Sequence, residues 1–460
     1  MLEPAHADVV IVGAGVAGLT AARQLTRAGV SVLVLEAAAG VGGRMSTEKI
    51  DGFRLDRTGQ LLTPAYRPCP SCPALPGTDG LAGLALRPFA PGVLVHGEGR
   101  RHRTGEPTHR PRRARGALSA ARALASAPRP TRGPRPPLGG PLDHARLGTA
   151  LARLAATPAE QLLARPERPV GATLPERGMP ARTLHTFVRP LLSALLCDPD
   201  LTTSSRAADL ALHAYAVGGL AVPEGGADAL PERLAAGLPP GTVHTGVRVT
   251  SVATDSVTTA GHGRVRCRTV VLATDAVAAA ELLPGLRVPD FHEVTVVHHA
   301  VPEPPLTEPV LLLDADHPGA LAHTSVISQV DPTRAPAGRS LVSSVVLGPP
   351  PDASALRARL AALYGTSTAG WETLAVHHTP RAVPAMPAPH DPRRPVRLLD
   401  GLYVCGDHRE TSTVQGALHS GRRAAHAVLA DLGVPVPAPE SAEPAPEHPA
   451  AAPPFGEAAA

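Results

Sequence analysis

The stretch "DVVIVGAGVAGLTAARQLTRAGVSVLVLE", which runs from Asp8 to Glu36, decides the fold of this chain. Val9 to Val12 is a short β-branched run, typical of a strand that is buried on both faces. Leu19 to Ala28 predicts a helix, and Val30 to Leu35 predicts a second strand. A strand, a helix and a second strand in this order form a βαβ unit. We therefore expect an α/β fold with a parallel sheet.

Three glycines of the same stretch have the spacing of a dinucleotide-binding turn. Gly13 allows a tight turn, Gly15 lets the backbone approach a pyrophosphate, and Gly18 lets the helix pack closely on the strand. Gly29 lies where a left-handed cap would end the helix. Glu36 ends the second strand, where a carboxylate accepts hydrogen bonds from a ribose diol and repels a 2′-phosphate. The stretch therefore predicts a dinucleotide site.

Length and composition exclude several other classes of protein. A chain of 460 residues is long enough for two or three domains, and its net charge of +4 is too small to imply a nucleic-acid partner. Five scattered cysteines do not describe a disulfide framework. The first strand begins near residue 8, which leaves no room for a signal peptide, and no apolar run reaches 18 residues. We expect a cytoplasmic protein.

Two glycines and an arginine follow the predicted ribose-binding acid, in "EAAAGVGGRMST". Gly42, Gly43 and Arg44 would put bare backbone and one fixed cation beside a pyrophosphate. Here the sequence resembles the flavin-dependent amine oxidase superfamily, which includes the monoamine oxidases, protoporphyrinogen oxidase and the phytoene desaturases. The resemblance implies non-covalent FAD on a glutathione-reductase-like Rossmann fold with an α+β substrate domain.

Further segments extend the resemblance along the chain. "FRLDRTGQLL" is similar to the family segment along the flavin ring, and "AVPEGGADALPERLAAGLP" looks like the turn and helix that lead back from the substrate domain. "VHTGVRVTSV" resembles the strand whose Val249 would pair with the adenine, and "LDGLYVCGDHRETSTVQGALHSGRRAA" matches the closing signature. The cofactor-binding residues that motifs and resemblance together imply are Gly13, Gly15, Val16, Ala17, Gly18, Glu36, Ala37, Gly42, Gly43, Arg44, Gly59, Gln60, Val249, Gly406, Asp407, Val414, Gln415 and Ala417.

The resemblance of this last segment also implies that a helix begins beside the flavin ring, whose charge changes on reduction. Gly406 and Asp407 would approach the ribityl chain. Val414, Gln415 and Ala417 would lie at a helix N-terminus that faces the flavin pyrimidine. A helix dipole there stabilises the negative charge that reduced flavin carries near N1.

The order of the motifs predicts a discontinuous cofactor domain. We expect the FAD-binding domain in residues 5–88, 218–288 and 396–432, the substrate domain in 89–217 and 289–395, and a disordered tail in 433–460. Within the first substrate segment, Arg100 to Pro137 holds eleven arginines, seven prolines, one acid and no aromatic residue. It is either a solvated, poorly ordered insertion or a patch for peripheral contact with an anionic membrane.

Two departures from the family pattern bear on the reaction. Many amine oxidases of the family hold a water at flavin N5 with a lysine, but Lys49 is the only lysine here and lies in the wrong part of the chain. Those oxidases also enclose the amine between aromatic rings, and this chain has only four tyrosines, five phenylalanines and one tryptophan. We therefore expect removal of a hydride from a C–H bond of an apolar small molecule. A lysine-free amine oxidase and a flavoprotein with purely structural FAD stay open as alternatives.

No acid–base pair stands out, and the sequence names neither the substrate nor the electron acceptor. His408 and Arg409 follow the flavin-binding turn and are the catalytic candidates. The pairs His298–His299 and His377–His378 are interpreted as core or surface residues, and at most one of each pair can face a pocket. Cys405 is interpreted as a core thiol. Cys69 and Cys72 have no second pair, so we predict no metal site.

Overall fold

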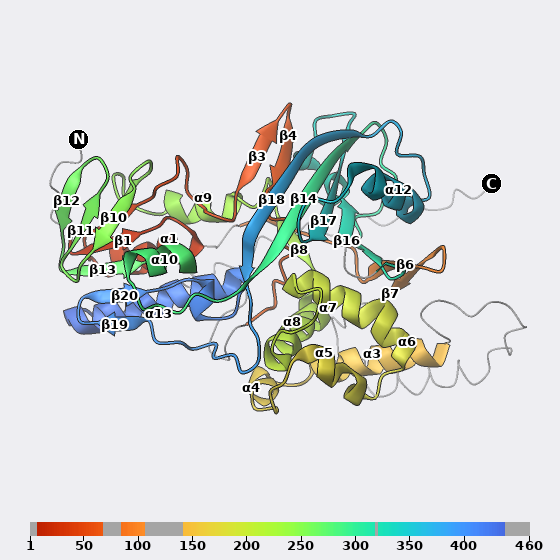
Figure 1. The fold of residues 1–460 in the computed structure, drawn as a ribbon, viewed down its shortest axis with the longest axis horizontal. Coiled ribbons are helices and arrows are strands. Elements are labelled where there is room, and N and C mark those ends of the chain that lie inside the picture. The colour runs from red at the N-terminus through yellow and green to blue at the C-terminus, as the bar shows by residue number, and fades with distance from the viewer. Residues whose placement is uncertain (1–6, 68–83, 106–140, 318–320, 438–460) are drawn as a thin grey trace, which may run out of the picture.

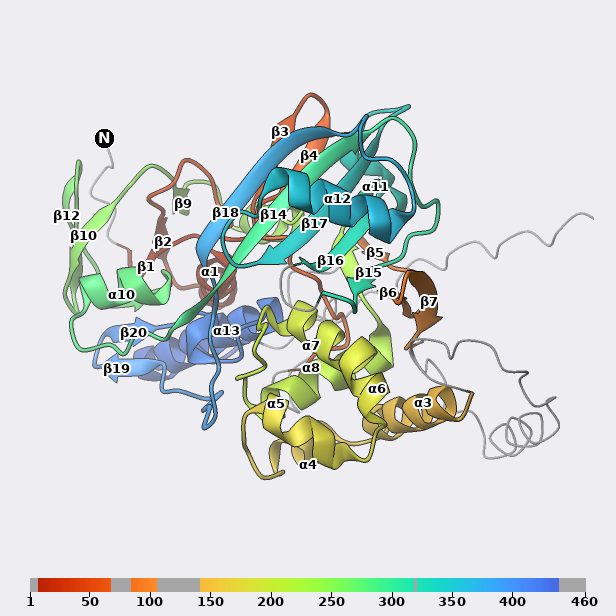
Figure 2. The same ribbon diagram turned by 45° about the vertical axis from the view of Figure 1, so that its right-hand side comes forward.

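The computed structural model describes residues 7–67, 84–105, 141–317 and 321–437. Two sheets dominate it, and they lie side by side in both views (Figures 1 and 2). The long strands β14 and β18 run from the second sheet toward the first. The paired cysteines at 69 and 72 lie outside the described residues, as does most of the arginine-rich segment.

The first sheet has six strands in the order β19-β20-β13-β1-β2-β9, parallel from β20 to β9. Its strands are β1 (Val9–Val12), β2 (Val32–Leu35), β9 (Val243–His244), β13 (Thr269–Leu272), β19 (Arg397–Leu399) and β20 (Leu402–Val404). Val9 and Ile11 pack on one face while Val10 and Val12 pack on the other. All four are buried, because both faces of the sheet are covered. The predicted α/β class is confirmed.

Helices cover one face of this sheet, and a small antiparallel sheet covers the other. The helices are α1 (Val16–Arg27), α9 (Ala229–Ala236) and α13 (Val414–Leu432), and the small sheet comprises β10 (Val249–Val252), β11 (Ser256–Thr259) and β12 (Gly263–Arg266). The helix α10 (Ala276–Leu282) follows β13. A Cβ atom at Gly421 would lie 2.2 Å from the carbonyl oxygen of Ala17, so α13 and α1 can meet this closely only with glycine there.

The second sheet has seven strands in the order β18-β14-β17-β16-β15-β6-β7. They are β6 (Val93–Gly97), β7 (Arg100–Thr104), β14 (Phe291–Val301), β15 (Leu312–Asp314), β16 (Leu321–Val326), β17 (Ser340–Leu347) and β18 (Glu372–Pro384). The helix α12 (Ala353–Tyr364) covers one face with Leu356, Leu360 and Leu363, which recur at helical spacing. Each such buried leucine contributes about 1.5–3 kcal/mol.

A layer of short helices covers the other face of the second sheet. It comprises α3 (Pro141–Ala155), α4 (Ala159–Leu163), α5 (Val170–Thr173), η1 (Leu174–Arg177), α6 (Ala181–Thr183), the π-helix η2 (Leu184–Val188), α7 (Arg189–Leu196) and α8 (Ser205–Gly218). Two further antiparallel pairs are the hairpin of β3 (Thr47–Ile50) with β4 (Phe53–Asp56) and the pair of β5 (Leu86–Pro88) with the distant strand β8 (Ala221–Pro223). The remaining short helices are α11 (Ile327–Val330), η3 (Pro332–Arg334) and η4 (Asp407–Arg409).

Several elements differ from the sequence-based expectation. The single strand expected over 243–252 is split into β9 and β10, which belong to different sheets. Arg100–Thr104 form β7 and pair with β6, so the interpretation of these five residues as part of a poorly ordered insertion was wrong. Their backbone hydrogen bonds to β6 order them despite their charge. The domain boundaries themselves stay predictions, although the first sheet draws its strands only from 5–88, 218–288 and 396–432.

Among the described residues, no helix combines the length and the apolar character that a membrane crossing requires.

A buried ionic network fastens the two sheets together. Arg334 in η3 is 1% exposed and donates to Asp56 on β4 at 2.8 Å and to Asp331 at 3.0 Å. The same two carboxylates accept from the backbone of Ala227 and Gly225, at 2.9 and 2.8 Å, in the turn that leads into α9. Burial alone would raise the pKa of Asp56, but the adjacent guanidinium outweighs it and lowers that pKa. The arginine therefore keeps the Asp56 carboxyl ionised in the interior.

The first prediction is that Arg334→Met destabilises the fold by about 3–5 kcal/mol, because it leaves two buried carboxylates without their cation. Urea denaturation at neutral pH measures this. The matched control is Arg168→Met, which removes a fully exposed partner of Glu176 and should leave the midpoint unchanged. Because the folded pKa of Asp56 is depressed, the wild type should lose this stabilisation only as pH falls through that pKa. An Arg334 variant as stable as the control would contradict the assignment.

Candidate active site

One cavity of about 750 Å³ connects the carboxyl ends of the first sheet with the edge of the second. Its volume lies within the range of about 300–1,000 Å³ that small-molecule and cofactor sites occupy. Residues from β1, β2, β10, β14 and β18 line it, together with the turn after β13, the helix α10 and the starts of α1 and α13. A ligand in open α/β sheets binds outside the carboxyl ends of the strands, which is where this cavity lies.

The glycine turn at the start of α1 has the form that a phosphate needs. Gly15 lines the cavity, and a Cβ atom there would meet nothing within 4 Å, so open space lies beside its backbone. The first backbone N–H groups of α1 have no intrahelical acceptor, and no acidic side chain lies in that first turn. A Cβ at Gly18 would lie 2.1 Å from the carbonyl oxygen of Gly13, so Gly18 serves packing and does not line the cavity. This end of the cavity suits an anion.

Glu36 lies at the end of β2 with both carboxylate oxygens fixed. One oxygen accepts from the backbone N–H of Ala14 at 2.7 Å, and the other accepts from that of Ala38 at 2.8 Å. A carboxylate has about four lone-pair sites, so each oxygen keeps capacity for a further donor such as a hydroxyl. Val249 and Arg248 line the cavity close to this end of the sheet. The arrangement can orient a diol.

Arg44 joins three distant segments in the middle of the cavity. Its guanidinium donates to Asp407 at 2.7 Å and to the carbonyl oxygen of Ala382 on β18 at 3.0 Å. Burial alone would lower the pKa of Arg44, but Asp407 raises it. Burial alone would likewise raise the pKa of Asp407, but Arg44 lowers it. Both side chains are therefore charged, and they hold β18 against the first sheet.

Uncharged side chains also line the cavity, although Arg381 on β18 is among the lining residues as well. Gln60, Cys197, Val294, Thr413 and Val414 line it, and Thr413 caps α13 by accepting from the backbone of Gly416 at 2.9 Å. Burial raises the pKa of the Cys197 thiol to about 12, which keeps it protonated. None of the described residues that line the whole cavity is lysine, histidine or aromatic.

The structure brings most of the predicted cofactor-binding residues to this one cavity. Those that line it are Gly13, Gly15, Val16, Ala17, Glu36, Ala37, Gly42, Gly43, Arg44, Gln60, Val249, Gly406, Asp407, Val414 and Ala417. Gly18, Gly59 and Gln415 do not. A Cβ at Gly59 would meet Val345 of the second sheet at 2.8 Å, and the Gln415 side chain donates to the carbonyl oxygen of Thr63. Their contribution is to packing around the cavity.

The structure does not bring the two catalytic candidates into the cavity. Gly406 has a φ of +144°, and a Cβ there would meet the His408 ring at 2.6 Å, so this ring folds back against the turn. Burial lowers the pKa of His408 to about 4. Arg409 instead donates to the carbonyl oxygen of Pro395. Neither side chain lines the cavity.

The other singled-out side chains also lie elsewhere. His298 bonds to Ser343 and to the carbonyl oxygen of Asp56, at 2.9 and 3.0 Å, while its neighbour His299 packs against Trp371. The pair at 377–378 contacts glutamates of β3 and β14. Cys405 is fully buried in the core of the first sheet, which confirms its interpretation as a core thiol.

Some residues that line the cavity were not predicted as site residues from the sequence. Asp275 could have been found, because "VVLATD" ends a parallel strand at the edge where ligands bind, and its carboxylate caps α10. Cys197 and Ala382 carry no such signal, because long-range packing brings the end of α7 and the strand β18 to the cavity.

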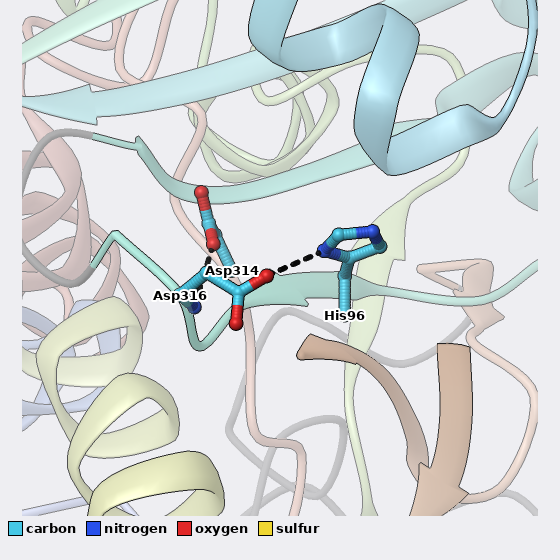
Figure 3. A group of neighbouring side chains, drawn as sticks. All are labelled: His96, Asp314 and Asp316. Carbon is cyan, nitrogen blue, oxygen red and sulfur yellow. Dashed lines mark hydrogen bonds and ion pairs between the residues drawn. The ribbon is translucent and has the colours of Figure 1, made fainter. Parts of the chain in front are cut away.

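Outside the cavity, one group of described side chains has the spacing of metal ligands. Figure 3 shows His96, Asp314 and Asp316 pointing toward one another. The guanidinium of Arg359 already pairs with both oxygens of Asp314, and the backbone N–H groups of residues 316 and 317 bond to one of them. Arg359 thus supplies the compensating cation, and we propose no metal here.

Comparison with known proteins identifies what this chain resembles. Residues 16–429 match the family model described as flavin containing amine oxidoreductase. A putrescine oxidase from Kocuria rosea is 54% identical over 57 residues, which are only 12% of either chain. An oxidoreductase from Methanosarcina mazei has a TM-score of 0.65 at 17% identity, covering 91% of this chain and 99% of that one. A cyclohexylamine oxidase from Brevibacterium oxydans gives 0.60 at 18%, covering 93% and 100%. The two solved structures share the fold.

The second prediction separates binding from packing with two glycine substitutions. Gly15→Ala should fold with unchanged stability but lose most of its bound cofactor, because its methyl group projects into the open cavity. Gly18→Ala should lose about 1–3 kcal/mol of stability, because its methyl group collides with the backbone at Gly13. Urea denaturation of the stripped protein and the flavin absorbance of the loaded protein measure the two effects. Equal effects of both substitutions on both measurements would refute this division of roles.

Proposed function

The chain belongs to the flavin containing amine oxidoreductase family, and on that premise we propose that it binds FAD without a covalent link and removes a hydride from a C–H bond of an apolar small molecule. A dinucleotide rather than a mononucleotide flavin is supported by the two ends of the cavity. The Glu36 carboxylate can hold a ribose at one end, and the start of α13 lies at the other. The open space at Gly15, at the start of α1, fits a pyrophosphate.

Non-covalent attachment is supported by the thiols near the cavity. Cys405 is fully buried in the sheet core and does not line the cavity. Cys197 lines it, but burial keeps its thiol protonated and therefore a poor nucleophile. No histidine or tyrosine of the described residues lines the cavity as an alternative attachment point.

The third prediction is that the purified protein is yellow and that heat or acid releases its flavin into the supernatant. Chromatography should identify the released flavin as FAD, because the Glu36 side of the cavity can hold a ribose that FMN lacks. Flavin colour that stays with the precipitated chain would contradict non-covalent binding, and release of FMN would contradict the dinucleotide.

The proposed reaction is supported by the uncharged side chains that line the cavity near the start of α13. When bound, oxidised flavin supplies a two-electron acceptor for hydride. The residues there, among them Gln60, Thr413 and Val414, can exclude water and position an apolar carbon. The start of α13 contributes a helix dipole, and its cap residue Thr413 fixes that terminus. A double bond would form as a neighbouring C–H or O–H bond breaks and its hydrogen leaves as a proton, which passes to the bulk solvent outside the site.

The absence of amine-handling residues is the observation that carries the proposal. Lys49 is the only lysine of the sequence, and it lies exposed on β3 and does not line the cavity. No aromatic residue of the described chain lines the cavity either. The names of relatives such as the putrescine oxidase favour amine oxidation, and this is the competing reaction. A structural role for the flavin is the second competitor.

The fourth prediction separates these three functions by anaerobic stopped-flow reduction. The flavin should lose its visible absorbance with a polyene or a porphyrinogen and keep it with putrescine or cyclohexylamine. Bleaching by amines alone would replace the proposal with a lysine-free amine oxidase. Failure of polyenes, porphyrinogens and amines to bleach a protein that retains FAD would instead indicate a structural cofactor.

A further inference from the structure

A second, very small chamber adjoins the cavity near the start of α13. Its volume is about 20 Å³, and it shares Gln60, Ser412 and Thr413 with the cavity. Space for one water requires about 10–15 Å³ on this scale. The chamber therefore accepts a single oxygen-sized group, such as a water or one substituent of a larger molecule.

Tyr66 contributes a buried hydroxyl to this chamber. The side chain is 1% exposed, and no hydrogen bond joins its hydroxyl to another described residue. The hydroxyls of Thr411 and Thr413 are its polar neighbours, and both act on its pKa as hydrogen-bonding groups, although neither pair has ideal geometry. A well-aligned acceptor in the chamber would therefore be favourable, because an unmade hydrogen bond of a buried group costs about 1–3 kcal/mol.

The hydroxyl acts as a donor. Burial raises the pKa of Tyr66, and the nearby Glu410 carboxylate raises it further, while the two threonines oppose this only in part. The phenol therefore keeps its proton and requires an acceptor. Two other donors lie nearby, the backbone N–H of Tyr66 and the side-chain amide of Gln415. Both already donate to the carbonyl oxygen of Thr63, so an acceptor that enters the chamber remains available to the Tyr66 hydroxyl.

The chamber disfavours a charged group. None of its lining residues is charged, and Leu195, Ala207 and Met386 give it apolar walls. An ionised carboxylate or ammonium in such a place would lose several kcal/mol of hydration without a counter-ion. A neutral oxygen loses far less and gains the phenol as its donor.

We infer that Tyr66 positions the substrate by donating a hydrogen bond to one neutral oxygen, a carbonyl or hydroxyl, which displaces water from the chamber. The inference rests on the proposed function, because the chamber opens where an apolar carbon would face the flavin. The substrate class is then an apolar molecule with a single neutral oxygen near the carbon that is oxidised. Tyr66 is a positioning residue for this group.

The fifth prediction is tested with three probes that share one alkyl chain: 2-octanone, octanoate and octylammonium. Each is titrated into the flavin-loaded protein by calorimetry, with flavin absorbance recorded in parallel. The wild type should bind 2-octanone at least tenfold more tightly than either charged probe. Tyr66→Phe, which removes only the hydroxyl, should weaken 2-octanone binding about five- to tenfold, the worth of one hydrogen bond.

The matched control is Tyr364→Phe, which removes another buried hydroxyl, one that bonds to Thr324 at 2.9 Å far from the cavity. It should lower the melting temperature and leave 2-octanone binding intact, whereas Tyr66→Phe should not lower the melting temperature. Unchanged 2-octanone affinity in Tyr66→Phe, no binding of 2-octanone, or tighter binding of a charged probe would overturn the inference. Because binding needs no turnover, a protein that binds 2-octanone through Tyr66 but never reduces its flavin would refute only the proposed function.

Discussion

The contact between Arg44 and Asp407 is the interaction on which the site depends. The two residues are 363 positions apart, and the same guanidinium also holds the backbone of β18 at Ala382. One side chain thus joins the turn at Gly42 and Gly43, the turn at Gly406 and the second sheet. Asp407 also balances part of the arginine's charge, so a bound diphosphate would meet a cation whose position is already fixed before the ligand arrives. Pre-organisation of this kind lowers the cost of binding.

The lining of the cavity combines charged groups with uncharged side chains, and this combination links structure to chemistry. Charged side chains such as Glu36 and Arg44 line it together with the open backbone at Gly15. Thr413 and Val414 are among its uncharged lining residues, and the one buried polar atom without a geometric hydrogen-bond partner among the described residues of the adjoining chamber is the Tyr66 hydroxyl. A cavity lined in this way can position a small molecule beside a bound cofactor.

Local patterns of the sequence were sufficient for the βαβ unit that begins the chain and for its glycine turn. The strand Val9–Val12 begins and ends as predicted, and the predicted helix Leu19–Ala28 overlaps α1 except for the first turn, because apolar periodicity is a local signal. Contacts between distant segments had no such signal: neither the Arg334 network nor the approach of Cys197 follows from spacing. His408 shows that a residue next to a binding motif in the sequence need not line the binding cavity. It follows the motif directly, yet its ring folds back against the turn at Gly406 and does not line the cavity.

The most direct test of this account is the electron density of the flavin in crystals of the loaded protein. The account predicts an extended FAD with its ribose at Glu36, its diphosphate beside Gly15 and Arg44, and its isoalloxazine ring between Gln60 and Thr413, at the mouth of the Tyr66 chamber. A flavin ring at the Glu36 end, or a flavin bound outside this cavity, would contradict it.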